Sequence, residues 1–207
     1  PTAQMAPYQF IAEHVIRTMG AYKWTIIAGA LGQPLLYRLG LGAGLAALIS
    51  TPVQDGDSSV RYLVFIAPAL LMTAGISVAS EEFTYPVMAG FKWRRLYFGP
   101  NASPISSPQI VTGTILGALL RIVIVVVVYF AVLVIFGAVP NLATGWLLMP
   151  IGALAALSFG LPLMAYAASL EHDSGQFALV QRFIFMPMFL FSGTFYPLAN
   201  LPIWLQW

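Results

Sequence analysis

The sequence has no cysteine and few charged residues, and both absences narrow what the chain can be. Without cysteine it has neither a disulfide framework nor a thiolate metal site. Charged residues make up 8% of the chain, against roughly 25% in a soluble domain. A net charge of +2 is too small and too dispersed to indicate nucleic-acid binding. An ordinary soluble globular protein and a nucleic-acid partner are therefore excluded.

Residues that support catalysis or nucleotide binding are also scarce. His14 and His172 lie far apart at predicted membrane boundaries, so nothing marks a Ser-His-Asp arrangement. The sequence Glu171-His172-Asp173 indicates a solvated charged turn more than a metal site. The run GLGAGLAAL lacks the Lys-Ser/Thr ending of a phosphate-binding loop. We therefore expect no catalytic residue, no metal site and no cofactor on this chain.

Long apolar runs dominate what remains. A hydrocarbon core about 30 Å thick requires about 20 apolar residues of helix. Five runs approach that length: Ile26–Ile49, Tyr62–Ala79, Ile110–Ala138, Leu147–Leu170 and Phe177–Phe195, the last interrupted by Pro187. Between the first two runs, the polar stretch TPVQDGDSSVR predicts a loop. The sequence predicts an all-α, polytopic membrane helix bundle that forms a single transmembrane domain over residues 1–207.

The basic residues predict how the chain is oriented, because short cytoplasmic loops are enriched in Lys and Arg. Six of the nine basic residues fall on one side if the N-terminus is cytoplasmic: Arg17, Lys23, Lys92, Arg94, Arg95 and Arg182. In the loops on the opposite side, the only basic residue is Arg61, which lies near two aspartates in the sequence. We expect a multi-pass protein of a bacterial inner membrane, with residue 207 outside after five spans.

Two segments outside the apolar runs have patterns of their own. Residues 1–24 place apolar and charged side chains at helical spacing, which predicts an amphipathic helix on the inner membrane surface or a charged flank of span one. Residues 81–108 are too long for a minimal turn, and long patterned loops often carry function. Within them, FKWRRLYF is typical of a short helix packed on another protein or anchored among lipid headgroups.

Several residues inside the runs bear on packing and on polarity. Gly40 and Gly44, and likewise Gly113 and Gly117, have the small-xxx-small spacing that lets membrane helices approach closely. Arg38 and Arg121 lie deep in spans one and three, where an unpaired cation costs several kcal/mol. Each arginine either faces a substrate pathway, extends toward headgroups or bonds to a neighbouring helix.

Glu81 and Glu82 are a pair of carboxylates at the predicted end of span two. Adjacent residues of a helix do not share a face. We therefore expect no joint acid–base chemistry from this pair.

Three segments in order support a family resemblance: GQPLLYRLGLGAGL, the stretch from Glu82 to SPISSPQIVTG, and FLFSGTFYPLANLPIWLQ. Together they resemble the membrane subunits of ABC-2 type transporters, closest to the branch of nodulation-factor (lipo-oligosaccharide) and daunorubicin-type drug exporters. The resemblance implies six spans and a cytoplasmic loop that docks on an ATP-binding subunit, with a docking helix at about Pro86–Phe98. It assigns docking to five residues: Glu82, Phe91, Trp93, Arg94 and Arg95.

The resemblance also implies a role for the last residues of the chain. Residues 191–207, which contain SGTFYPLANLPIW, correspond to a re-entrant outer segment, since broken backbone is tolerated at membrane depth only where protein or water satisfies it. The expected outer gate consists of Gly193, Phe195, Tyr196 and Pro197. The family's sixth span is absent from this chain.

By this resemblance, the chain is the permease subunit of an ATP-driven exporter that works as a homodimer or close heterodimer. Two ATPase subunits in trans would hold ATP and Mg, and Arg38 and Arg121 are the candidate substrate-pathway residues. An amphipathic substrate such as a glycolipid, a lipid-linked saccharide or a hydrophobic drug fits apolar spans with two buried arginines. The alternative is a self-powered carrier or channel, which needs membrane-embedded acidic residues or inverted repeats. An intramembrane enzyme needs clustered His, Asp or Ser, and the sequence has no such cluster.

Overall fold

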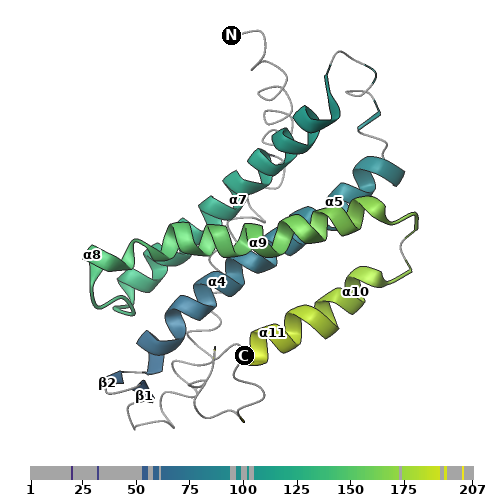
Figure 1. Ribbon diagram of the computed structural model, residues 1–207. Helices are drawn as coiled ribbons and strands as arrows, with labels where there is room; N and C mark the ends of the chain where they lie inside the picture. Colours follow the sequence, from purple (N-terminus) through teal and green to yellow (C-terminus); the bar gives the residue numbers. More distant parts are fainter. Residues whose placement is uncertain are drawn as a thin grey trace.

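The protein is a bundle of long apolar helices with a small β-hairpin at one end (Figure 1). The computed structural model describes residues 20, 32, 53–55, 58–60, 62–93, 97–98, 102, 105–172, 174–191, 194 and 202. The hairpin pairs β1 (Val53–Asp55) with β2 (Ser58–Val60) in antiparallel register, with Gln54 opposite Ser59. It lies in the stretch for which the sequence predicts only a loop.

The first described helical run has three parts. Helix α4 (Tyr62–Phe83) is followed by α5 (Tyr85–Met88) and by the π-helical segment η2 (Ala89–Trp93). The break falls at Thr84, two residues before Pro86, because proline lacks an amide hydrogen and collides with the carbonyl four residues earlier. The Thr84 hydroxyl donates to the carbonyl oxygen of Ser80 at 2.7 Å. The helical run thus extends well beyond the predicted span end at Ala79.

Helix α7 (Ser107–Ile135) is the longest element, and its ends follow from local sequence. At its start, the Ser106 amide donates to Gln109 Oε1 at 2.8 Å and Pro108 occupies the first turn, both typical of a helix N-terminus. At its end, Gly137 has a positive φ of 65°, and the Ala138 amide donates to the Leu133 carbonyl at 2.9 Å. A glycine in this conformation ends a helix without strain.

The remaining helices return across the bundle. The short α8 (Leu142–Gly145) leads into α9 (Leu148–Ser169). After a turn at Gly175, which has a φ of 86°, the chain forms α10 (Gln176–Val180), the π-helical segment η3 (Gln181–Phe185) and α11 (Met186–Phe191). Because these three are continuous in sequence and helical throughout, they form one apolar helix over Gln176–Phe191, called the fourth helix below.

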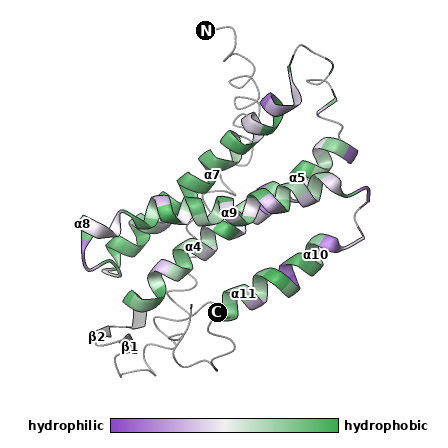
Figure 2. Cartoon of the chain, in the orientation of Figure 1, coloured by the Kyte–Doolittle hydropathy of each residue, from purple (hydrophilic) through white to green (hydrophobic). Residues whose placement is uncertain are grey.

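Three described helices are long and apolar enough to cross a membrane: Val64–Lys92, Ser107–Ile135 and Leu142–Ser169. They correspond to predicted spans two, three and four, and most of their surface is apolar (Figure 2). The fourth helix, in the place of predicted span five, is shorter than these three. Predicted span one lies almost entirely outside the described residues, so five spans remain a prediction.

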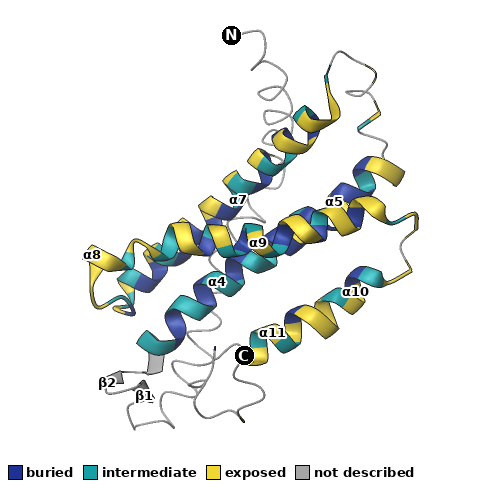
Figure 3. Ribbon diagram, viewed as in Figure 1, coloured by how far each residue is buried: buried dark blue, intermediate teal, exposed yellow. Residues whose placement is uncertain are grey.

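The core is centred on α4, with both α9 and α7 packed against it (Figure 3). The contact between α4 and α9 is made by small residues. A Cβ built on Gly75 would lie 3.3 Å from the Gly152 carbonyl oxygen and 3.4 Å from Ala156 Cβ. A Cβ on Gly160 would lie 2.5 Å from the Phe83 ring. The two backbones therefore approach as closely as glycine permits, the usual means of helix association in lipid.

Candidate functional site

Three charged residues meet where α4 packs against α7. Arg121 of α7 forms ion pairs with both acidic residues near the end of α4: Nη1 with Glu82 Oε1, and Nη2 with Glu81 Oε2, the latter at 3.2 Å. The planar guanidinium offers several donors in a fixed fork, so one arginine can serve two carboxylates. The Glu82 side chain is 15% exposed and that of Glu81 is 66% exposed. We call these three residues the charge cluster.

The charge cluster lies at membrane depth. Arg121 is the central residue of α7, with about 21 Å of helix on either side at 1.5 Å per residue. Glu81 and Glu82 lie inside the candidate span Val64–Lys92 and not at its end, because α5 and η2 extend the helix past them. At this depth an unpaired arginine has a high free-energy cost. The ion pairs with α4 offset much of that cost. The cluster thus contains two carboxyl groups for one guanidinium.

Two polar atoms near this region remain unsatisfied. In the described part of the chain, Arg121 Nε and Ser80 Oγ are buried without a hydrogen-bond partner. A buried donor without a partner costs about 1–3 kcal/mol. The cluster is thus well paired through its Nη atoms and incompletely satisfied elsewhere.

Beyond the charge cluster, the end of the helical run is built from aromatic rings. The Tyr97 ring packs on Gly90, where a Cβ would lie 2.2 Å from ring carbon Cε2, and the Tyr97 amide donates to the Gly90 carbonyl at 3.3 Å. Tyr97 also meets Phe91 edge to face, with ring centroids 4.8 Å apart. Burial raises the pKa of Tyr97 above its ordinary value, and a hydrogen bond with Thr114 partly opposes the shift. Gly90 therefore allows the segment after η2 to fold back onto it.

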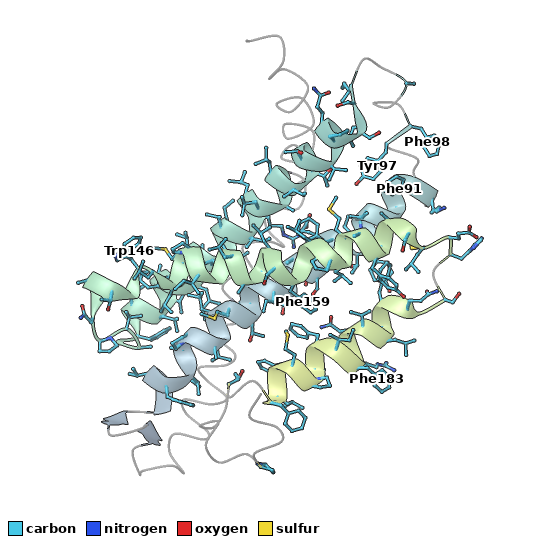
Figure 4. All side chains as sticks on the ribbon, viewed as in Figure 1. Phe91, Tyr97, Phe98, Trp146, Phe159 and Phe183 are labelled. Carbon is cyan, nitrogen blue, oxygen red and sulfur yellow. The ribbon has the colours of Figure 1, made fainter. Side chains whose placement is uncertain are left out.

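A hollow of about 160 Å³ lies beside these rings. Figure 4 shows Phe91, Tyr97 and Phe98 together at the end of the bundle where η2 ends and α7 begins. The wall is completed by side chains from the first two turns of α7 and one from α9; its lining residues are Phe91, Tyr97, Phe98, Ser107, Ile110, Val111, Thr114 and Met164. We call this feature the aromatic hollow.

The structure describes three of the predicted site residues with their side chains. It brings together Glu82, predicted for docking, and Arg121, predicted for the substrate pathway. It places Phe91 apart from them, partly exposed beside the aromatic hollow. Trp93 is described only as the last residue of η2. Seven predicted site residues lie outside the described residues: Arg38, Arg94, Arg95, Gly193, Phe195, Tyr196 and Pro197. Thr194, beside the predicted gate, is buried.

Sequence reasoning missed two features of this region. It predicted no shared role for Glu81 and Glu82, yet one guanidinium reaches both. The available signal was charge balance, because no Asp or Glu occurs between Glu82 and Glu171, which leaves Arg121 without an acidic partner nearby in sequence. It also passed over Gly152, Ala156 and Gly160, whose four-residue spacing is the small-residue pattern found in close helix packing.

Comparison with known proteins identifies one family and two kinds of relative. The sequence model of the ABC-2 type transporter family matches residues 14–207. Nodulation protein J of Rhizobium leguminosarum bv. viciae is 27% identical over 87% of this chain and 67% of its own length, and that of Rhizobium meliloti is 27% identical over 85% and 64%. ABC transporter G family member 20 of Dictyostelium discoideum is 27% identical over 76% of this chain but only 21% of its own length. No solved structure matches the chain.

The long apolar helices and the paired charges between them define a multi-pass membrane protein. The chain belongs to the ABC-2 type transporter family, and it is thus a membrane component of an ABC transporter. It spans about two thirds of the length of the Nodulation protein J relatives.

Proposed function

We propose that this chain is the permease subunit of an ATP-driven exporter that moves an amphipathic substrate outward across a bacterial inner membrane. Two permease subunits pair with two ATPase subunits, which hold ATP and Mg. The substrate class is a glycolipid, a lipid-linked saccharide or a hydrophobic drug, in keeping with the resemblance to nodulation-factor and drug exporters. Closure of the ATPase subunits on ATP moves the end of α4–η2 and tilts the attached spans, which opens the pathway.

The observation that carries this proposal is the ordered end of the bundle at Tyr85–Trp93. Here the helical run passes beyond the charge cluster and ends at Trp93, and the sequence continues with Arg94 and Arg95. Tyr85 of this run is exposed, and the contact of Tyr97 with Gly90 stiffens its end. Aromatic anchors surrounded by basic residues supply the contact area and the electrostatic register of a protein interface. Because α4 is the centre of the core, a push on this end reaches both α7 and α9.

The charge cluster supports a fixed contact between α4 and α7 more directly than it supports substrate binding. Arg121 is engaged by two carboxylates, so it is not free to hold an anionic group unless those pairs open. We propose that the exposed side of the cluster, at Glu81, lines the pathway, and that the Arg121–Glu82 pair fixes α4 to α7. Arg38 remains the second candidate pathway residue.

Docking can be tested by replacing Trp93, Arg94 and Arg95 together with alanine and measuring capture of the ATPase subunit by the tagged chain. We expect capture to fall at least about tenfold, because central aromatic and arginine residues carry most of the energy of an interface. The control is Trp146→Ala, an exposed tryptophan at the opposite end of the bundle (Figure 4). Equal capture by both variants would refute docking at this end.

A self-powered carrier remains the alternative, and Glu81 is the observation that favours it. This carboxylate is exposed and lies within a candidate span, as an ion-coupling residue requires. Transport into sealed vesicles separates the two proposals, because a carrier runs on an ion gradient without nucleotide. Uptake that requires ATP and the ATPase subunit supports the exporter.

A further inference from the structure

We propose that the aromatic hollow binds the acyl chain of an anionic membrane lipid, whose headgroup lies beside Lys92. The inference concerns lipid recognition by this chain and does not depend on ATP-driven export. It rests on the lining of the hollow, its depth in the membrane and the exposed Lys92 next to Phe91 of its wall.

The lining suits hydrocarbon and offers little to a polar group. Its walls are the rings of Phe91, Tyr97 and Phe98 and the aliphatic side chains of α7 and α9. The Thr114 hydroxyl donates to the Ile110 carbonyl at 2.8 Å and also shares a hydrogen bond with the Tyr97 hydroxyl, so both hydroxyls are already engaged. An apolar cavity of about 150 Å³ stays dry and accepts a benzene-sized group. The hollow, at about 160 Å³, has room for an apolar group of the same size.

The hollow lies at the depth where acyl chains begin. Helix α7 has 29 residues, about 43 Å of helix, against a hydrocarbon core of about 30 Å. A centred α7 therefore leaves about 6.5 Å, a little over one turn, at each end among the headgroups. Ser107 and Ile110 belong to this interfacial turn, and Thr114 lies just inside the hydrocarbon. A lipid lying against this end can place its headgroup in water while part of its chain enters the hollow.

The exposed charge of Lys92 beside the wall of the hollow favours an anionic headgroup. Lys92 is exposed and follows Phe91 of the wall directly. The sequence continues with Arg94 and Arg95, and it has no Asp or Glu between Glu82 and Glu171. A basic side chain near a membrane surface is attracted to anionic lipid headgroups. Charge complementarity thus favours a lipid with a net negative headgroup over a zwitterionic one.

The test uses the assembled complex in nanodiscs, with phosphatidylglycerol that carries a diazirine close to the carboxyl end of one acyl chain. After irradiation, mass spectrometry measures labelling of residues 105–116. Val111→Phe fills the hollow, and we expect labelling to fall at least about fivefold. Val127→Phe is the matched control, because both valines lie on α7 and both are 44% exposed. If Val111→Phe does not fold, Met164→Phe fills the hollow from the α9 wall.

A second arm tests the headgroup. Lys92→Gln is expected to reduce labelling by the phosphatidylglycerol probe about threefold, while Arg182→Gln, another exposed basic residue, leaves it unchanged. A phosphatidylcholine probe with the same chain is expected to label more weakly than phosphatidylglycerol. Undiminished labelling of the filled variants overturns the acyl-chain site, and equal labelling by the two lipids overturns the headgroup assignment. Labelling that appears only after removal of the ATPase subunit shows that the partner covers the hollow, which also overturns the proposal.

Discussion

The unit formed by α4, α7 and α9 and the fourth helix beside it are both apolar, yet they are held by different contacts. Within the three-helix unit, glycine and alanine bring backbones together and an ion pair joins α4 to α7. The fourth helix contacts that unit through rings such as Phe185 against Phe159, with centroids 6.0 Å apart. Its Phe177 also meets Tyr85 of α5, with centroids 5.0 Å apart.

The difference matters because lipid removes the hydrophobic drive that holds helices together in water. What remains is close packing and polar contact, and the three-helix unit has both. Among the described residues of the fourth helix only Phe177 and Phe185 are buried, and its outer face is apolar and exposed. We infer that the fourth helix can shift against a rigid unit at small cost, as alternating access requires.

The largest effect should come from breaking the ion pair in the rigid unit. Glu82→Leu leaves Arg121 with only the exposed Glu81 as a partner, and removal of one partner from a buried pair costs about 3–5 kcal/mol. We expect a loss near the lower end of that range in chemical unfolding of the purified protein. Arg121→Leu combined with Glu82→Leu should recover most of it, because the orphaned charge is then gone. A double variant no more stable than Glu82→Leu would contradict this account.

The next effect should come from bulk added between α4 and α9. In Gly160→Leu the new side chain meets the Phe83 ring and Ala79, and overpacking costs about 1–3 kcal/mol. Ser158→Leu adds similar bulk on the exposed face of the same helix and serves as the control. We expect a lowered thermal midpoint for Gly160→Leu alone. Equal thermal midpoints for the two variants would show that the contact between α4 and α9 is not tightly packed.

The smallest effect should come from the rings that attach the fourth helix. Phe185→Ala removes an edge-to-face contact with Phe159 and a stacked contact with Phe189, each worth about 0.5–1.5 kcal/mol. Phe183→Ala removes a ring that is 73% exposed and points away from α9 (Figure 4), so it should change stability little. We expect Phe185→Ala to lower stability by about 1–2 kcal/mol and to change transport more than stability. A loss as large as that of Glu82→Leu would mean that the fourth helix belongs to the rigid unit.

Much of the architecture was predictable because it depends on local composition. Apolar runs of span length predicted the three long helices. The limits of α7 follow from residues typical of helix ends: Ser106 and Pro108 at its start and Gly137 after its last turn. The end of α4 was predicted too early, because hydropathy falls at Glu81 and Glu82 while the helix continues through a break at Thr84. The hairpin at 53–60 was missed because short polar strands have little apolar pattern to reveal them.

The sequence alone determined that this is a membrane helix bundle of the ABC-2 type, since chain composition and segment order are properties of the chain itself. Only the tertiary structure decided what Arg121 does. In sequence it is one arginine in an apolar run, with its acidic partners 39 and 40 residues away. The antiparallel packing of α7 on α4 brings these charges to one depth, where the low polarity of the membrane makes pairing far more favourable than separation. The same packing of helix ends gathers Phe91, Tyr97, Ile110 and Met164 around one hollow, because contacts between distant segments depend on helix register and not on local pattern.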